Sequence, residues 1–479
     1  MSHAYSLFKL PQKERIEMVG EQKIFISSLG IGKNASSLHF SCWLRIRLYF
    51  GKLFIIMRKT FILIAILAVV MAEKYAIVFQ GDTGYGNYSD SSNTCRAYND
   101  IVLSGIPREN IIYMANEQIH TDSRNPWPGK LFTLPDPEGE GWDHAKDCKE
   151  HYDYTSKHIS PEVVIAILTQ DEEKVKELTG LENPKVFHTT EEDTIFVYYS
   201  DHGYEGGVGC GGGRLTTEQI QDALKTLHAN KGYSKLAFFL EACESGSVFD
   251  TLPTDLNIYA FTSANRTEPA WCEHCPPDDV VNGKNIGVCM SMYYDNEYQR
   301  LWEAESTTIT LGELFQRTHD HVAKFKHQEV SEWGDLKMRD LPMTTFIGDK
   351  PIKTSYSAPS NKESVKVELS ATPLHNAKWA AIRGQENAEE KLRAVISENV
   401  KREIETMRMA AYVLGEKEMN AKLNVDTEVY NASCAAEVFE ALMNQCGQTM
   451  PFPKYARNLV HAMCHEGKTL SIDWSEVCM

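Results

Sequence analysis

The stretch Lys235-Leu236-Ala237-Phe238-Phe239-Leu240-Glu241-Ala242-Cys243-Glu244-Ser245-Gly246-Ser247 decides the fold class of this chain. It holds a short apolar run that ends in small polar residues, which is typical of a buried parallel strand leading into a loop. Open α/β sheets carry their chemistry at the carboxyl ends of such strands. Cys243 therefore lies where a reactive group is expected.

A second stretch of the same design lies upstream, at Thr194-Ile195-Phe196-Val197-Tyr198-Tyr199-Ser200-Asp201-His202-Gly203. This expected strand ends in a histidine. If the two strands are neighbours, the thiol of Cys243 and the imidazole of His202 meet at one edge of the sheet. A thiol beside an imidazole is the minimal apparatus for nucleophilic acyl transfer.

The segments around these two stretches alternate between strand and helix patterns. Ser160 is expected to cap a helix that has Pro161 at its first position. Such alternation predicts an α/β fold with a mainly parallel central sheet. Further buried strands are expected at residues 75–81, 111–114, 257–264 and 343–348, and helices at residues 94–103, 161–180 and 217–227.

Two stretches between these elements are rich in turn-forming residues. Residues 124–155 are irregular and rich in Pro, Gly and Asp, and a loop of that length is usually functional. Residues 206–213 are rich in glycine but lack the Gly-Lys-Ser/Thr ending of a phosphate-binding loop. We expect a mobile surface loop there.

The C-terminal part of the chain has a different character. Residues 350–385 are predicted to form a linker, because their first part is rich in Ser, Pro, Lys and Asn with little periodicity. Residues 386–479 are predicted to form a small all-α domain, and an even group of cysteines in it suggests two disulfides. Its long helix would carry Leu392, Val395, Ile396, Val400, Ile404 and Met407 on one face, and its cysteines are Cys434, Cys446, Cys464 and Cys478.

The N-terminal part looks like a secretory leader. Residues 57–72 have a basic start, a short apolar core and small residues at the expected cleavage positions. A signal anchor is the alternative, although the apolar run is short for a membrane span. Because residues 1–56 precede this segment, we expect translation to begin at Met57 and residues 1–56 to be a non-native extension. No later segment is apolar enough to span a membrane.

Charge and cysteine content narrow the function classes. The net charge of −17 combines +7 in residues 1–72 with −24 in the remainder, so binding to nucleic acid phosphates is not expected. Secretion would place the twelve cysteines in an oxidising compartment, where Cys243 is the natural candidate for a free thiol. Cys272-Glu273-His274-Cys275 has no second pair at zinc-finger spacing. We therefore expect a disulfide or free thiols there, and neither a metal nor a cofactor.

The quoted residues resemble the legumain (asparaginyl endopeptidase) family of cysteine peptidases, from Glu73 to Met479. The two strand ends, Glu241-Ala242-Cys243-Glu244-Ser245-Gly246-Ser247 and Ser200-Asp201-His202-Gly203, match the family's signature blocks. Asn125-Pro126-Trp127-Pro128-Gly129 and Asp153-Tyr154-Thr155 match as well. The resemblance implies a caspase-like α/β sandwich at residues 73–349, followed by a helical prodomain.

The resemblance also implies the catalytic roles. Cys243 would be the nucleophile, His202 the general base and acid, and Asn87 the residue that supports the histidine. The oxyanion would be bound by backbone donors of Gly203 and Cys243. Asn87 has other readings, as a turn residue or as a glycan acceptor in Asn87-Tyr88-Ser89.

The expected substrate pocket departs from the family pattern. The family's arginine corresponds to Ser89, its pocket aspartate to Val288, and its Glu-Ser-Ser-Tyr/Phe stretch to Glu268-Pro269-Ala270-Trp271. Losing the arginine and the aspartate predicts an altered or relaxed P1 preference, either more apolar or, through Glu241, polar or cationic. The expected substrate-binding residues are Glu241, Asp201, Ser89, Asp90, Trp271 and Val288.

By the same resemblance, the C-terminal prodomain would cap the active site as an intramolecular inhibitor of a secreted or lysosomal zymogen. Its disulfides would join Cys434 to Cys464 and Cys446 to Cys478. Acid would loosen a cap that is held by ion pairs. Proteins and peptides are the expected substrates.

Three alternatives remain open. The catalytic subunit of the glycolipid-anchor transamidase shares the Cys/His arrangement, but it usually ends in a membrane span and lacks the four-cysteine prodomain. A legumain-type peptide ligase would use the same acyl-enzyme. A catalytically silent binding protein could keep the fold with an altered pocket.

Overall fold

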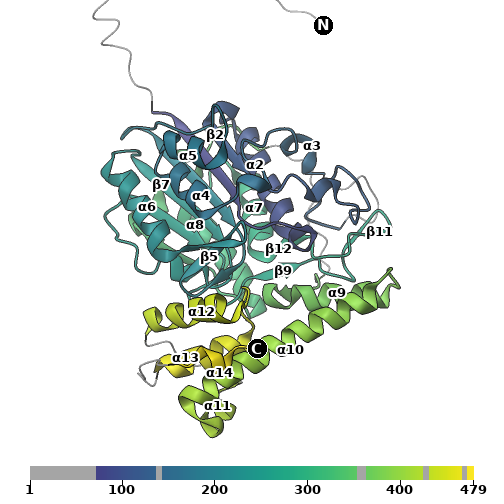
Figure 1. Ribbon diagram of the computed structural model, residues 1–479. Helices are drawn as coiled ribbons and strands as arrows, with labels where there is room; N and C mark the ends of the chain where they lie inside the picture. The colour runs from purple at the N-terminus through teal and green to yellow at the C-terminus, as the bar shows by residue number, and fades with distance from the viewer. Residues whose placement is uncertain (1–71, 136–142, 353–362, 424–430, 466–471) are drawn as a thin grey trace, which may run out of the picture. The chain divides into compact units, whose positions relative to one another are not determined.

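The computed structural model describes residues 72–135, 143–352, 363–423, 431–465 and 472–479. The residues before 72, which include most of the expected signal peptide at 57–72 and all of the expected extension at 1–56, lie outside the described part of the chain. The described residues form a central six-stranded sheet with helices on both faces (Figure 1). In spatial order its strands are β13 Ser331–Gly334, β8 Ile258–Thr262, β7 Lys235–Glu241, β3 Thr194–Ser200, β1 Lys74–Gln80 and β2 Ile111–Met114.

All strand pairs of this sheet are parallel except one. β1 pairs with β2 and β3, β7 pairs with β3 and β8, and β13 joins β8 as an antiparallel edge strand. The two strands that decide the fold are neighbours in register, with Ser200 opposite Glu241. The expected α/β sandwich with a mainly parallel sheet is therefore confirmed.

Apolar side chains from both faces of the sheet are buried under helices, as strand alternation requires. One face, with Phe196, Tyr198 and Phe239, lies under α2 Tyr88–Ser104, α7 Tyr293–Glu305 and α8 Leu311–Val322. The other face, with Val197 and Phe238, lies under α4 Pro161–Leu168, α5 Glu172–Thr179 and α6 Thr217–Ala229. The segments that carry His202 and Cys243 leave the sheet at the carboxyl ends of β3 and β7.

The expected last strand at residues 343–348 is wrong. Met343–Thr345 form a single 3-10 turn, in which Thr345 N–H donates to Pro342 O at 2.8 Å. The sheet instead ends in β13, whose residues are only half-buried. A short edge strand needs no continuous apolar run, so the sequence carries little signal for it.

The helix predictions are confirmed with changed bounds. Ser160 caps α4, whose first residue is Pro161, but the expected helix at 161–180 divides between Leu168 and Glu172. α2 begins earlier than expected and ends at Gly105, which has the positive φ of 107° that favours glycine. The helix expected at 217–227 is α6.

The glycine-rich stretch at 206–213 is not the expected surface loop. It forms an antiparallel sheet of β4 Gly203–Tyr204, β5 Gly207–Cys210 and β6 Gly213–Thr216, in which β5 is buried. A Cβ on Gly209 would come within 2.5 Å of the Asp201 carboxylate. The glycines thus allow close packing against the site.

The C-terminal region is helical and packs at one end of the domain, next to β5 and β9 (Figure 1). Its disulfides join Cys434 to Cys464 and Cys446 to Cys478, as the family resemblance predicts. Its helices are α9 Thr372–Ile382, α10 Ala388–Leu414, α11 Glu416–Lys422, α12 Ala432–Cys446, α13 Lys454–His465 and α14 Trp474–Val477.

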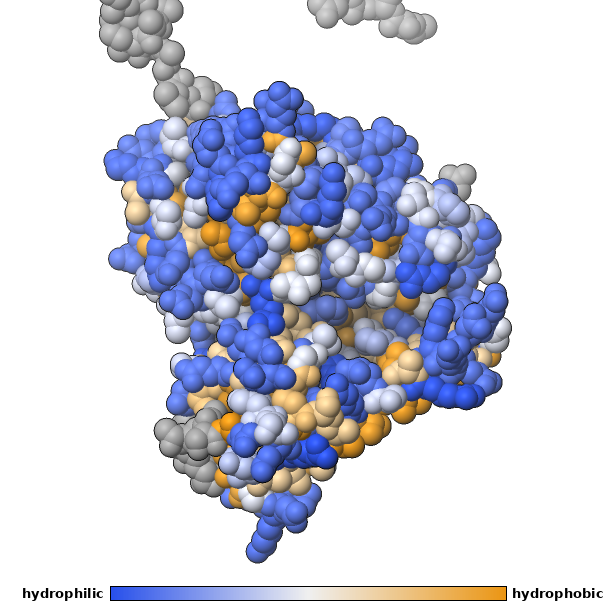
Figure 2. Space-filling view, viewed as in Figure 1, coloured by the Kyte–Doolittle hydropathy of each residue, from blue (hydrophilic) through white to orange (hydrophobic). Residues whose placement is uncertain are grey.

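The linker predicted at 350–385 is only partly a linker. Residues 353–362 lie outside the described residues, but 363–385 include strand β14 Val367–Glu368 and helix α9. The apolar stripe of α10 is present, yet Ile396, Val400 and Ile404 on it are exposed. Figure 2 shows apolar patches over this part of the surface.

The remaining elements are short. β9 pairs with β12 on one side and with β14 on the other, and it borders the site described below. Among the described residues, no helix is both long and apolar enough to cross a membrane. These elements are α3 Ala145–Cys148, β9 Trp271–Glu273, β10 Val280–Val281, β11 Lys284–Asn285 and β12 Ser291–Met292.

Candidate active site

Cys243 and His202 lie at the same edge of the sheet, as the sequence predicts. Each follows directly on a strand, His202 after β3 and Cys243 after β7, and these strands are parallel neighbours. A Cβ on Gly203 would lie 1.9 Å from Cys243 O. The backbones that carry the imidazole and the thiol are therefore packed directly against each other.

The His202 ring is oriented by Asn87. Its Nε2 lies 3.2 Å from Asn87 Oδ1, while Asn87 Nδ2 donates to Thr83 O at 3.0 Å. This arrangement gives Nε2 the donor role and leaves Nδ1 without a hydrogen-bond partner. Burial lowers the pKa of His202, Asp90 opposes this effect, and Arg402 adds to it. A neutral imidazole with a free Nδ1 can accept a proton.

The Cys243 thiol is fully buried. Its sulfur accepts a hydrogen bond from Ala270 N–H at 3.4 Å. Burial raises the pKa of Cys243 well above its ordinary value, and the Glu244 carboxylate acts in the same direction while Arg457 opposes it. The raised pKa favours the protonated thiol at Cys243, which is unreactive toward carbonyls.

Gly203 offers a direct test of this packing. We expect Gly203→Ala to lower kcat/KM by about 100-fold or more, because the new methyl group must push the Cys243 backbone out of position. The thermal midpoint should also fall. Gly86→Ala is a suitable control, since a Cβ on Gly86 meets nothing within 4 Å. Equal activity of the two variants would contradict the assigned packing.

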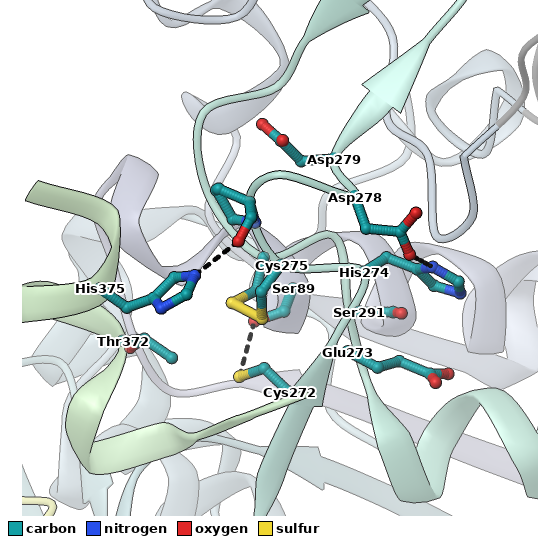
Figure 3. Close-up of a disulfide and its surroundings, with 12 residues drawn as sticks. Ser89, Cys272, Glu273, His274, Cys275, Asp278, Asp279, Ser291, Thr372 and His375 are labelled. Atoms are coloured by element: carbon teal, nitrogen blue, oxygen red, sulfur yellow. Dashed lines mark hydrogen bonds and ion pairs between the residues drawn. A yellow bond between two sulfur atoms is a disulfide. The ribbon is translucent and has the colours of Figure 1, made fainter. Parts of the chain in front are cut away.

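Four of the expected substrate-binding residues lie around the ends of β3 and β7. Glu241 is buried at the end of β7, and Asp90 accepts a hydrogen bond from Ser200 Oγ at 2.7 Å on the neighbouring strand. Ser89 Oγ contacts Asp90 Oδ2 at 3.3 Å. It also contacts Cys272 Sγ at 3.9 Å (Figure 3). The fourth residue, Asp201, lies on the opposite face of the sheet.

That position of Asp201 follows from alternation after Ser200. Its carboxylate accepts a hydrogen bond from His202 N–H and faces Gly81 and Gly209. It therefore fixes the His202 backbone and does not join Glu241.

Two other expected pocket residues lie elsewhere. Trp271 packs on Phe325 and His327, with ring centroids 4.8 and 5.5 Å away, whereas the next residue, Cys272, faces Ser89. Alternation along β9 separates these two side chains. Val288 is buried in the apolar cluster under α2 and α7. The structure thus gives no support for a pocket made apolar by Trp271.

A segment of the C-terminal region lies against Cys243. β14 pairs antiparallel with β9, with Val367 opposite Cys272, and Leu369 N–H donates to Ala270 O at 3.0 Å. Val367 and Leu369 pack in one apolar cluster with Cys243. An added strand at this edge is the mode by which peptides bind to many proteins.

Helix α13 completes the cover with polar contacts that the sequence does not predict. On α13, Arg457 lies 3.3 Å from Glu244 and 3.2 Å from Glu368, and His461 Nε2 lies 2.7 Å from Glu205 Oε2. All of these groups except the partly exposed Glu368 are nearly or fully buried. Glu244 directly follows Cys243. A charged residue at this position is the sequence feature that could have indicated these contacts.

Glu244 gives the docked helices a pH dependence. Burial raises the pKa of Glu244 to about 8, although Arg457 opposes this effect. Once the helices leave, the solvated carboxyl returns toward its ordinary pKa of 4.5. Between these values the docked state holds a proton that the open state has lost. Through this group, docking strengthens as pH falls and weakens as pH rises toward 8. The direction is opposite to the expected loosening by acid.

We therefore expect Glu244→Gln to flatten the pH dependence of docking. The ratio of Cys243 labelling rates in the wild-type and Glu244→Gln proteins, at each pH between 5 and 8, cancels the thiol's own titration. This ratio should rise with pH. A ratio that falls with pH would mean that Glu244 loosens the helices in acid.

A disulfide braces the loop after β9, where the sequence predicts either a disulfide or free thiols. Cys275 is bonded to Cys289, and Cys95 to Cys148, so the free cysteines among the described residues are Cys210, Cys243 and Cys272. His375 of α9 lies 2.7 Å from Pro276 O beside this disulfide (Figure 3).

Arg383, next to α9, makes two hydrogen bonds with buried Asp279 at 2.6 and 2.8 Å. These contacts connect α9 to the loop that the Cys275–Cys289 disulfide braces. In the described residues, no group of three or more His, Cys, Asp or Glu side chains is placed to hold a metal ion.

Comparison with known proteins agrees with this site. Residues 74–349 match the family model described as Peptidase C13 family. A vacuolar-processing enzyme of Phaseolus vulgaris is 31% identical over 62% of this chain, which spans 60% of that enzyme's length. A hemoglobinase of Schistosoma mansoni is 30% identical over 83% of this chain and 89% of its own. A legumain of Canavalia ensiformis is 29% identical over 62% of both chains.

Among solved structures, caspase-1 from Spodoptera frugiperda aligns with 55% of this chain and 88% of its own, at 10% identity and a TM-score of 0.31. The fold of residues 74–349 is the caspase-like α/β sandwich that the family resemblance predicts. The family match covers more than half of the chain and contains both strand ends of the site. This chain therefore belongs to the Peptidase C13 or legumain family of cysteine-type endopeptidases.

Proposed function

We propose that this protein hydrolyses peptide bonds in proteins through an acyl-enzyme on Cys243, and that it is made as a zymogen. The observation that carries the proposal is the edge shared by Cys243, His202 and Asn87, with β14 added to the adjacent strand β9. β14 occupies the edge of β9 along which an extended substrate would lie.

The proposed reaction follows from the positions of these groups. The Cys243 sulfur attacks the substrate carbonyl, and its proton passes to the free Nδ1 of His202. Backbone N–H groups of Gly203 and Cys243 stabilise the oxyanion. His202 then protonates the leaving amine, and water that His202 deprotonates releases the acyl group. Asn87 keeps the ring oriented throughout.

The zymogen proposal rests on the cover over Cys243. β14 and the buried pairs of Arg457 and His461 exclude solvent from the thiol, whose pKa is raised by that burial. Release of residues 363–479 would expose the thiol and bring its pKa closer to the ordinary range. The C-terminal region thus acts as an intramolecular inhibitor.

An activating cut would fall in an accessible, non-helical segment. Asn361 lies outside the described residues, and Asn376 lies inside helix α9. Asn387 precedes α10 and is exposed at the junction of the two helices. Of these two described asparagines, only Asn387 is in a segment that a peptidase can bind without unwinding a helix.

The proposed compartment is the secretory pathway, ending in an acidic vacuole, a lysosome or outside the cell. Four disulfides support an oxidising environment. The leader-like residues 57–72 and the vacuolar-processing enzymes among its relatives agree with this compartment. We also propose that the loss of the family's pocket arginine and aspartate alters the P1 preference.

One experiment tests activation and hydrolysis together. The purified full-length protein is incubated at a series of acid and neutral pH values, with the new termini sequenced and peptidase activity followed over time. We expect a cut between residues 350 and 388, followed by hydrolysis of an unfolded protein substrate. Removal of the C-terminal region without activity, and without labelling of Cys243 by a thiol-directed probe, would favour a silent binding protein. Adding a peptide amine separates hydrolysis from ligation, since only a ligase yields the joined product.

A further inference from the structure

We infer that Glu241, together with Asp90 and Asp295, forms an acidic site that binds a positively charged P1 side chain, lysine or arginine. This inference rests on the proposed peptidase function and names the substrate class of the same site.

The unpaired carboxyl belongs to Glu241. Its side chain is fully buried, and neither carboxyl oxygen has a hydrogen-bond partner among the described residues. Ser263 lies near enough to lower its pKa slightly, but the Ser263 hydroxyl donates to Ala242 O at 3.0 Å. Buried carboxyl groups are rarely left without partners, so a missing partner points to a ligand.

Glu241 is also in the right position for P1 recognition. It lies two residues before Cys243, so alternation along the strand directs both side chains to one side of the sheet. That side carries Tyr198 and Ser200 of the neighbouring strand, with Ser200 directly opposite Glu241. The side chain that fixes specificity is therefore adjacent to the nucleophile.

Two further carboxylates flank Glu241. Ser200 Oγ donates to Asp90 Oδ1 and Tyr198 OH donates to Asp295 Oδ2, both at 2.7 Å. Each carboxylate is thus held by a strand residue next to Glu241. One oxygen of Asp295 also lacks a hydrogen-bond partner.

The carboxylates around Glu241 favour the binding of a cation. Burial raises the pKa of Glu241, and the charges of Asp295 and Asp90 raise it further, with no Lys or Arg opposing them. Arg96, which acts on Asp295, is engaged in two hydrogen bonds with Glu303 at 2.6 and 2.9 Å. Without a cation beside it, the buried Glu241 favours its protonated form. A lysine or arginine side chain would displace the proton and form charge-assisted hydrogen bonds.

A metal ion is not the expected occupant, because no metal-holding cluster exists in the described part of the chain. An asparagine side chain could hydrogen-bond with a protonated Glu241 but brings no charge to balance the carboxylates. The family's arginine would supply that charge from the protein, and this chain has Ser89 in its place.

Small residues mark the approach to the site. Ser89 contacts both Asp90 and Cys272, and Cys272 lies on β9, along which the substrate would extend (Figure 3). In the covered state Val367 of β14 lies opposite Cys272 and closes this approach. Removal of β14 would therefore open the way from β9 to Asp90 and Glu241.

The test uses the processed enzyme and peptides that differ only at P1: arginine, lysine, citrulline, asparagine and aspartate. Citrulline has nearly the shape of arginine but no charge. We expect kcat/KM for arginine or lysine to exceed that for citrulline and asparagine by about 100-fold or more, because a site with unpaired polar groups rejects ligands that cannot pair with them. Glu241→Gln should remove most of this preference, so that within this variant kcat/KM for arginine lies within a few-fold of that for citrulline.

Two measurements distinguish a failure of this inference from a failure of the proposed peptidase function. Labelling of Cys243 by a thiol-directed probe, together with the thermal midpoint, shows whether each variant is folded and has a reactive thiol. If Glu241→Gln does not fold, Ser89→Arg replaces it, since a protein guanidinium beside Asp90 should compete with a cationic P1 side chain. Preferred cleavage after asparagine, or equal cleavage after citrulline and arginine, overturns the inference and leaves the peptidase function intact. No cleavage of any peptide and no label on Cys243 contradicts the proposed function itself.

Discussion

Cys243→Ala is expected to abolish peptide hydrolysis, lowering kcat/KM by about 10⁴-fold or more. The reason is chemical, because the proposed acyl-enzyme forms on the Cys243 sulfur and alanine offers no nucleophile. The fold should be retained, since alanine fits the buried position and the Ala270 N–H loses only one weak acceptor. The measurement is hydrolysis by the processed enzyme, with the thermal midpoint followed in parallel.

Cys210→Ala is the matched control for this variant. Cys210 is also a free and buried thiol, but it lies on β5 beside Tyr199 and away from the substrate edge. Cys210→Ala should keep activity within a few-fold of the wild type. Activity of Cys243→Ala within tenfold of the wild type would show that the nucleophile is elsewhere.

The central sheet could be predicted because its inner strands have local signals. β3 and β7 are continuous apolar runs that end in polar turn residues, which is the pattern of strands buried on both faces. The edge strand β13, Ser331-Glu332-Trp333-Gly334, has no such run and was missed. Its place depends on pairing with β8, which lies about 70 residues earlier in the chain, and pairing at that distance leaves little local trace.

The catalytic arrangement could be predicted for a similar reason. Cys243 and His202 follow strands that were recognised, so sheet topology alone brings them to one edge. The role of Asn87 is predicted only by the family resemblance, because a Gly-Asn-Tyr turn has no helical or strand period. The structure adds the hydrogen bond to His202 that its expected role requires.

The cover over the site could not be predicted in detail. β14 is a two-residue strand in a segment that resembles a linker, and it forms only because β9 offers a free edge. Arg457 meets Glu244 across more than 200 residues of chain, and neither residue has a local pattern that reveals the other. Asp201 and Trp271 were assigned to the pocket by motif position, yet strand alternation turns both away from Glu241.

Arg457→Ala is expected to release the C-terminal region that covers Cys243. Arg457 is buried between Glu244 and Glu368 and also donates a hydrogen bond to Phe452 O. Above pH 8, where the docked Glu244 carries its charge, removing Arg457 from this buried ion pair costs about 3–5 kcal/mol, because the Glu244 carboxylate loses its compensation, so labelling is compared above pH 8. Helices that dock through these carboxylates should therefore separate from the peptidase domain far more often.

The readout is the rate at which a thiol-directed probe labels Cys243 in the unprocessed protein. A loss of about 3 kcal/mol in docking corresponds to a rate increase of about 100-fold, since each 1.4 kcal/mol is a factor of ten. The C-terminal helices should stay folded, because the Cys434–Cys464 and Cys446–Cys478 disulfides hold them independently of the docked surface.

Arg393→Ala is the control for charge and residue type. Arg393 lies on α10, is largely exposed and pairs only with exposed Glu389 four residues away, a contact worth about 0.3–0.5 kcal/mol. Its labelling rate should match that of the wild type. If Arg457→Ala labels no faster than Arg393→Ala while both proteins remain folded, the buried Arg457 pairs do not hold the cover, and its stability must come from β14 and the apolar contacts of Val367 and Leu369.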